Sequence, residues 1–199
     1  MDRSHWPVAK TNRFSSSLFD QARYNRYTEH IISMGHAWTF NKTLPFLPMR
    51  RNTTRPAGKL LDDALKLAGI DRGQAYLTNA VKHFKFILRG KKRIHNKPSI
   101  QEAIACRPWL AAELDLIKPD VLVCLGATAA QSLMGTDFRI TRQRGEFRQT
   151  PWCNATIATF HPSAVLRAPD IHHREQLWSH LVADLTKAAR PLFDIGIRA

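Results

Sequence analysis

Three polar residues in the sequence have side chains that can take part in chemistry. Asn79 ends one apolar run, His161 directly follows another, and His95 lies in the basic stretch Lys91–Ser99. An amide side chain offers a donor and an acceptor to the edge of an amide-like heterocycle, and an imidazole can act as a proton donor, a base or a nucleophile. These residue types are compatible with a site that recognises a heterocyclic ring and reacts beside it.

The stretch around His95 carries charge of one sign. From Lys82 to Lys97 inclusive there are seven Lys or Arg, and no Asp or Glu occurs between Asp71 and Glu102. Such a field attracts a polyanion, and the cations around His95 favour its neutral, nucleophilic form by penalising protonation. The alternative is a solvated basic loop in which His95 only contacts phosphate.

The other two residues also have simpler explanations. Asn79 can satisfy backbone groups where a strand ends, and His161 can pack at a strand terminus. Followed by a proline that stiffens the turn and by Ser163, His161 could instead donate to a carbonyl oxygen that gains charge as a base leaves. Just beyond, Leu166 could wedge into a base stack or belong to the core, and Arg167 could hold a phosphate.

The composition favours one intracellular domain with a polyanionic partner. The 199 residues are 44% hydrophobic, and 30 Lys and Arg against 16 Asp and Glu give a formal net charge of +14. Nucleic acid is the expected partner, ahead of an anionic membrane surface. No apolar run reaches the roughly eighteen residues of a membrane span, and no secretion signal is recognisable, which predicts a cytoplasmic protein. Cys106, Cys124 and Cys153 form no CxxC pair and are expected to be reduced.

The hydrophobic periodicity predicts alternating helices and strands after Pro56. Helices are expected from 56 to Gly69, from the Ser99/Glu102 capping box to Pro119, from Ala127, and over 171–189; strands are expected at 75–81, 121–125 and 155–160. Thr141–Gly145 is expected to form a loop. On the last helix, Asp184 and Lys187 are expected to point outward.

This alternation predicts an α/β fold, a three-layer α/β/α sandwich with a short central parallel sheet. The domain is expected over 56–190, between an atypical segment at 1–55 and a tail at 191–199. In parallel sheets, ligands bind beyond the carboxyl ends of the strands. Asn79, the turn at Gly126 and His161 are therefore expected to meet at one edge, with the basic loop opening on the same side.

Five segments together resemble the uracil-DNA glycosylase superfamily. They are TNAVKHFKF from Thr78, KKRIHNKPS from Lys91, ACRPWL from Ala105, LGATAA from Leu125 and FHPSAVLR from Phe160. The segment Lys92–His95 resembles the RRIH-type loop that marks the UdgX branch of the iron–sulfur, family 4 type enzymes. The resemblance covers roughly 56–185, and it implies the short-sheet sandwich fold of that superfamily.

The resemblance implies a monomeric DNA repair enzyme without a membrane partner. It would act on uracil-containing DNA, single-stranded or with the base flipped out, and cleave the N-glycosidic bond. Substrate binding is implied for Asn79, Arg93, Ser163, Leu166 and Arg167. His161 would assist the departing base, and His95 would attack the sugar C1′ and stay attached to the abasic DNA.

Residues 1–55 depart from the family pattern. Such proteins carry a first strand followed by a GEQPG-type motif that contributes to catalysis, and neither is recognisable here. This predicts impaired activity, a first strand that is missing or replaced, and a disordered or frame-shifted N-terminal segment. The family also holds a [4Fe-4S] cluster, but only His83 and Cys106 match its ligand positions, and two protein ligands predict an incomplete or absent cluster.

Four functional outcomes stay open from the sequence. The first is a glycosylase that captures its DNA through His95, and the second is a hydrolytic glycosylase in which His95 only contacts DNA. The third is a basic nucleic-acid binding module without catalysis. The fourth is a product that does not fold stably, because a missing strand would leave a sheet edge exposed.

Overall fold

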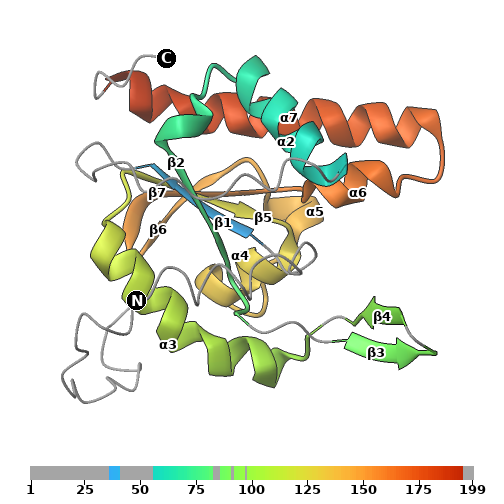
Figure 1. Ribbon diagram of the computed structural model, residues 1–199. Helices are drawn as coiled ribbons and strands as arrows, with labels where there is room; N and C mark the ends of the chain where they lie inside the picture. The colour runs from blue at the N-terminus through green and yellow to red at the C-terminus, as the bar shows by residue number, and fades with distance from the viewer. Residues whose placement is uncertain (1–35, 41–55, 83–85, 91, 97, 195–199) are drawn as a thin grey trace.

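A computed structural model describes residues 36–40, 56–82, 86–90, 92–96 and 98–194 of the chain, and Figure 1 shows a central sheet between two layers of helices, with a separate hairpin. The strands are β1 (His36–Phe40), β2 (Ala75–Asn79), β3 (Phe86–Arg89), β4 (Lys92–His95), β5 (Val121–Leu125), β6 (Phe147–Thr150) and β7 (Cys153–Thr159). The helices are α2 (Pro56–Leu67), the 3-10 helix η3 (Arg72–Gln74), α3 (Ile100–Ile117), α4 (Ala127–Met134), α5 (Ile140–Gln143), α6 (Pro162–Leu166) and α7 (Ile171–Asp194). The predicted three-layer α/β fold is confirmed.

The sheet is mixed, and the prediction of a parallel sheet is wrong for two of its strands. Its order is β2-β1-β5-β7-β6. β5 and β7 are parallel, and β1 runs antiparallel to both β2 and β5, so that β2, β5 and β7 share one direction. β6 is antiparallel to β7 because only a two-residue turn joins them, and parallel neighbours need a long crossover.

A strand precedes β2, where the sequence pattern predicted that the first strand was missing or replaced. β1 comes from the segment in which we expected no strand, and it pairs over five residues with β2 on one side and with β5 on the other. Without it, the facing edges of β2 and β5 would leave a row of backbone groups to be satisfied in another way. The sheet is therefore continuous from β2 to β6.

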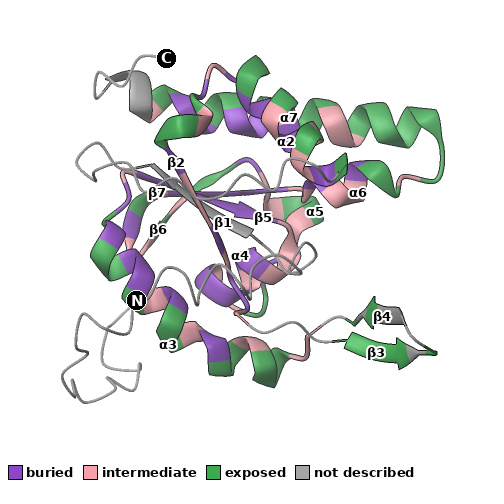
Figure 2. Cartoon of the chain, in the orientation of Figure 1, coloured by how far each residue is buried: buried purple, intermediate pink, exposed green. Residues whose placement is uncertain are grey.

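Each face of the sheet carries its own hydrophobic core, and β5 contributes to both. Val123 and Leu125 pack with residues of α2 and α7, such as Leu65 and Leu181. The alternate residues Leu122 and Cys124 pack with residues of α3 and α4, including Leu110, Leu114, Ala129 and Leu133. Because successive residues of a strand face opposite ways, a strand buried throughout must lie between two layers. Figure 2 shows this buried centre.

The predicted start and end of α3 are confirmed. The Ser99 hydroxyl accepts a hydrogen bond from the Glu102 N–H at 3.2 Å, and the Glu102 carboxylate accepts one from the Ser99 N–H at 2.6 Å. Lys118 then leaves the helix in the left-handed region at φ 48°, directly before Pro119. This capping box fixes where the chain turns from the hairpin into α3.

Three local predictions need correction. The basic stretch Lys91–Ser99 is not a plain loop, because β4 pairs antiparallel with β3. Thr141–Gly145 is not all loop either, since α5 extends to Gln143. The last helix continues past 189 to Asp194, into the segment predicted as a tail. Within the described residues, no helix has the length and apolar character needed to span a membrane.

Candidate active site

Asn79, Gly126 and His161 lie at one edge of the sheet, as the sequence predicts. They end or directly follow β2, β5 and β7, which share one direction. Asn79 and His161 are both half-buried. Three strand spacings of about 4.8 Å separate the backbones of β2 and β7, which places the two strand ends about 14 Å apart. Their side chains can therefore act on opposite sides of a small planar ligand.

The imidazole of His161 is held by the residues that follow it. Its Nδ1 accepts a hydrogen bond from the Ser163 N–H at 3.0 Å, and the Ser163 hydroxyl lies 2.7 Å from the same nitrogen. Because the backbone N–H can only donate, Nδ1 carries no proton and the proton of the neutral ring is on Nε2. His161 is the N-cap of α6, and Pro162 is the first residue of that helix. The arrangement fixes which ring nitrogen of His161 carries the N–H.

Gly126 allows the ends of β5 and β7 to approach each other. It has φ 87°, and a Cβ built on it would lie 3.1 Å from the Cβ of His161. Its N–H donates to the Thr159 carbonyl at 2.8 Å. The turn predicted at Gly126 is therefore a direct neighbour of His161.

β1 brings a residue to this edge that sequence reasoning missed. His36 pairs in register with Asn79 on one side and with Leu125 on the other. Its backbone thus lies between the ends of β2 and β5, while its side chain lies outside what the structure describes. The absence of a sustained hydrophobic period in residues 1–55 gave no signal for this position.

His95 lies at the end of β4, where it pairs in register with Phe86. The side chains of His95 and Arg93 lie outside the described residues, so their predicted roles are not tested by the geometry. The hairpin exposes Phe86, Ile87 and Leu88, with Leu88 67% exposed. Figure 1 shows it projecting from the body beside the start of α3. An apolar, exposed ribbon in a basic stretch of sequence suits contact with a partner.

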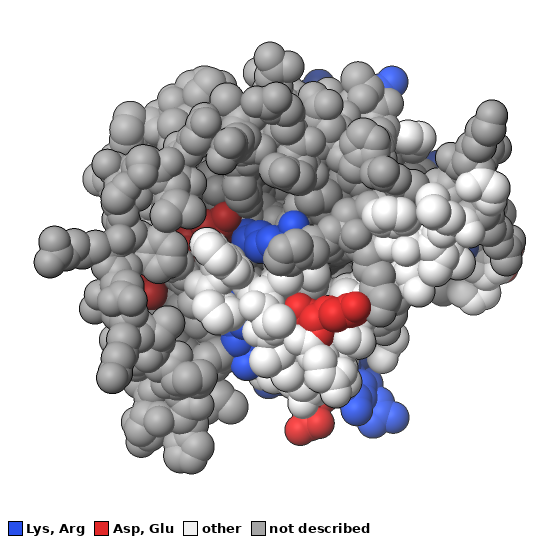
Figure 3. Space-filling model, turned by 60° about the horizontal axis from the view of Figure 1, so that its bottom comes forward, with Lys and Arg blue, Asp and Glu red and all other residues white. Residues whose placement is uncertain are grey.

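The described surface on the α3 side is mainly uncharged, with a few separate Lys, Arg, Asp and Glu side chains (Figure 3). α3 exposes Ile104, Trp109 and Leu116. The predicted basic field therefore depends on side chains of the 82–97 stretch that are largely outside the described part, and it stays a prediction.

The substrate-binding residues predicted after His161 occupy the end of α6. Leu166 is 39% exposed, so the alternative that it belongs to the core is not supported. Arg167 is exposed and is the C-cap of the same helix. Both lie within six residues of His161 along the chain.

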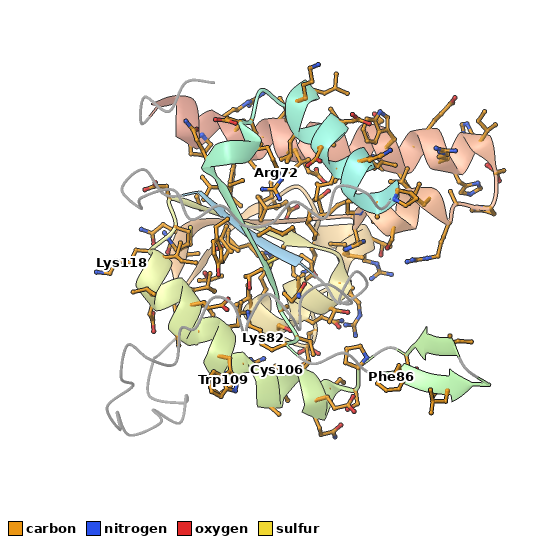
Figure 4. The ribbon with its side chains drawn as sticks, in the orientation of Figure 1. Arg72, Lys82, Phe86, Cys106, Trp109 and Lys118 are labelled. Carbon is orange, nitrogen blue, oxygen red and sulfur yellow. The ribbon has the colours of Figure 1, made fainter. Side chains whose placement is uncertain are left out.

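Behind Asn79 lies a buried charged group that the sequence reasoning missed. Glu113, on α3 and 7% exposed, accepts a hydrogen bond from the Thr78 hydroxyl at 2.7 Å and one from Lys82 Nζ at 2.6 Å. Lys82 Nζ also donates to the Thr78 hydroxyl at 2.7 Å. Burial lowers the pKa of Lys82, while Glu113 opposes that shift. Figure 4 shows Lys82 between the end of β2 and α3.

A second buried charged group lies behind His161, and it corrects the prediction that Asp184 points outward. Asp184 is only 2% exposed. Both of its oxygens accept from Arg144 Nη1 at 2.8 Å, and Oδ2 also accepts from the Thr159 hydroxyl at 2.6 Å. Lys187 is exposed as predicted, although its Nζ donates to the Gly145 carbonyl at 3.2 Å.

Helical spacing contained a signal for both acids. Asp184 follows the core residue Leu181 by three positions, and Glu113 follows the core residue Leu110 by three. Residues three apart lie on the same face of a helix. Both side chains are buried despite their charge, because a cation and a threonine hydroxyl bind each carboxylate inside the protein.

The described residues do not fit a [4Fe-4S] cluster by themselves. Cys106 is buried beside Val81, whereas Cys124 and Cys153 belong to the core between the sheet and α3 and α4. The other predicted ligand, His83, lies outside the described residues. In the part of the chain that the structure describes, no three His, Cys, Asp or Glu side chains could together hold a metal. The incomplete or absent cluster stays a prediction.

Comparison with known proteins adds to this geometry. A family model described as the uracil DNA glycosylase superfamily matches residues 22–186. A protein of Thermotoga maritima named type-4 uracil-DNA glycosylase is 34% identical over 133 residues, which are 66% of this chain and 64% of the relative. The protein of that name from Archaeoglobus fulgidus is 32% identical over 146 residues, 69% of this chain and 70% of the relative.

A third relative of the same name, from Pyrobaculum aerophilum, is 31% identical over 120 residues, 57% of this chain and 58% of the relative. The matched part of the chain spans 64% of the Thermotoga maritima protein, which is less than two thirds of its length. The family match nevertheless covers most of the chain, including β1 and every strand of the sheet. The chain belongs to the uracil DNA glycosylase superfamily.

Proposed function

We propose that this protein is a uracil-DNA glycosylase of the UdgX branch. It would bind a uracil flipped out of DNA, cleave the bond between the uracil N1 and the sugar C1′, and capture the sugar through His95. The substrate class follows from the family and from the three relatives named type-4 uracil-DNA glycosylases.

One observation carries the chemistry of this proposal, namely the hydrogen bond from the Ser163 N–H to Nδ1 of His161. Its Nδ1 accepts from the Ser163 N–H, which leaves the proton on Nε2. When the N-glycosidic bond breaks, its electron pair leaves with uracil, and negative charge develops on the uracil carbonyl oxygens. A preformed N–H donor stabilises that charge, and an oriented donor of this kind is typically worth about 3 kcal/mol of barrier.

The position of Asn79 supports its assignment to base recognition. Its backbone lies about 14 Å from that of His161 by strand spacing, and its amide can make two complementary hydrogen bonds to the uracil edge. Leu166 and Arg167, exposed at the end of α6, would contact the DNA around the flipped nucleotide.

The capture step concerns His95 alone. A lone pair on its imidazole would form a bond to C1′ as uracil departs, and the ring would then lose its other N–H proton to solvent. The base leaves with the electrons of the broken bond, so no oxidant or cofactor is required. We include no step through an iron–sulfur cluster.

A denaturing gel tests the proposal. The protein is mixed with an end-labelled single-stranded oligonucleotide that contains one uracil, and then heated before electrophoresis. The wild-type chain should give a shifted, heat-stable band, and His95→Ala should abolish it. Asn96→Ala, an exposed neighbour of His95, is the matched control and should keep the shift. An oligonucleotide with thymine in place of uracil should give no band.

Other results would select the alternatives. Abasic product without a shifted band would retain the glycosylase and overturn capture by His95. Binding that ignores uracil and falls steeply with salt, with neither adduct nor product, would overturn the enzyme and favour a basic nucleic-acid binding module.

A further inference from the structure

Two of the strands that end at the site, β2 and β7, are anchored in the same way. Thr78 of β2 donates to the buried Glu113 on α3, and Thr159 of β7 donates to the buried Asp184 on α7. Each carboxylate is also bound by a cation, Lys82 in the first group and Arg144 in the second. The two groups lie on opposite faces of the sheet, because α3 and α7 cover opposite faces.

Each anchored threonine lies next to a residue of the proposed site. Thr78 directly precedes Asn79, and Thr159 is two residues before His161. The threonine hydroxyls are buried, and each is fixed by a charge-assisted hydrogen bond of 2.6 to 2.7 Å. Bonds of this type are about twice as strong as bonds between neutral groups.

Asp184 constrains the chain before His161 by a second route. The Arg144 guanidinium that it binds lies over the Phe160 ring, with 5.4 Å from Cζ to the ring centroid. Phe160 is the residue between Thr159 and His161. Arg144 Nη2 also lies 2.5 Å from His180 Nδ1, which must accept because a guanidinium can only donate.

Stability alone does not account for these groups. A buried ion pair gains little over well-packed apolar residues of the same volume, because desolvating the charges offsets their attraction. An ion pair with hydrogen bonds instead fixes the orientation of the backbone segment to which it is bound. The two groups occur where a fixed direction matters, at the strand ends that carry the proposed site residues.

We propose that Glu113 and Asp184 are positioning residues, each of which orients a different residue of the site. Glu113, through Thr78, sets Asn79 for uracil recognition, whereas Asp184, through Thr159 and Arg144, sets His161 for departure of the base. The inference rests on the proposed glycosylase function. It states that Glu113 affects uracil recognition and Asp184 affects departure of the base.

The test removes each hydroxyl and leaves the ion pairs in place. Asp184→Ala would leave the Arg144 guanidinium unpaired and risk unfolding, so Thr159→Val and Thr78→Val are the variants of choice. Thr159→Ser and Thr78→Ser restore the hydroxyl and are the rescue controls. Single-turnover excision of uracil is followed at increasing protein concentration, which separates the maximal rate from the half-saturating concentration.

Thr159→Val should lower the maximal rate by about tenfold or more, because small displacements of a catalytic group have large effects, and should leave the half-saturating concentration nearly unchanged. Thr78→Val should raise the half-saturating concentration by about tenfold for uracil DNA, and leave binding of thymine DNA as it is. Both serine variants should return to within about twofold of the wild type.

Two results would overturn the inference. One is a loss of urea resistance in both valine variants with both kinetic parameters unchanged, which would make the groups structural only. The other is a change of the same parameter by both variants. A wild-type chain that neither excises nor captures uracil would overturn the proposed function, and the inference with it. If the wild type is active, the results for the valine variants test the inference alone.

Discussion

At the scale of single residues, the site depends on one close backbone approach. Gly126 follows β5, His161 follows β7, and a methyl group on Gly126 would press against the His161 Cβ at 3.1 Å. Gly126 also has φ 87°, a conformation that residues with a Cβ rarely adopt. The position of the His161 ring therefore depends on its own cap and on the small size of its neighbour.

Gly126→Ala should lose activity as well as stability. Gly135→Ala is a matched control. Gly126 directly precedes α4 and Gly135 directly follows it, with φ 105° and nothing within 4 Å of a built Cβ. Both variants should lose about 1 to 2 kcal/mol of stability from backbone strain. Only Gly126→Ala should lower the single-turnover rate of uracil excision further, by about tenfold, because it displaces His161. Equal rates in the two variants would contradict this.

At the scale of elements, the strongest local patterns were predictable and the weaker ones were not. The capping box at Ser99, the five apolar residues of β5 and the stripe of α7 are each specified by several residues that agree. The hairpin was missed because β3 and β4 have four residues each and expose their apolar side chains, so no buried face imposes a period. β1 was missed because its place is set by pairing with β2 and β5, distant in sequence.

The capping box should make a measurable contribution to stability. Ser99→Ala removes the acceptor for the Glu102 N–H and should lower the free energy of unfolding by about 1 kcal/mol. Gln101→Ala, exposed in the same turn, is the control and should change stability by less than about 0.5 kcal/mol. Urea unfolding at equilibrium measures both. A Ser99→Ala midpoint equal to that of Gln101→Ala would show that the cap contributes nothing.

At the scale of the whole molecule, the fold class and the edge that carries Asn79 and His161 could be predicted from sequence. Strand direction follows from the alternation of elements, and parallel strands place their ends together. The burial of Glu113 and Asp184 was predictable only in part: helical spacing from Leu110 and Leu181 places both at core positions, but their charge favours exposure. Their burial depends on Lys82, Arg144 and two threonines that meet them only in the folded chain.

The central core adds a pH dependence to the stability of the molecule. Cys124 lies fully buried in β5, and burial raises the pKa of its thiol from 9.0 to about 12. The unfolded chain therefore releases this proton at lower pH than the folded chain. The contribution to stability is complete below about pH 9 and is lost as the pH rises toward 12, by up to about 1.4 kcal/mol per pH unit.

Cys124→Ala should remove this dependence. At neutral pH the variant should be less stable than the wild type by about 1 kcal/mol, because it leaves a small cavity. Urea unfolding at intervals from about pH 7 to 11 measures both chains, and other titrating groups cancel in the difference between them. That difference should be constant to about pH 9, then shrink and change sign by about pH 10 to 11, because the wild type loses up to about 1.4 kcal/mol per pH unit as its thiol ionises on unfolding. A difference that stays constant to pH 11 would show that the thiol keeps an ordinary pKa in the folded protein.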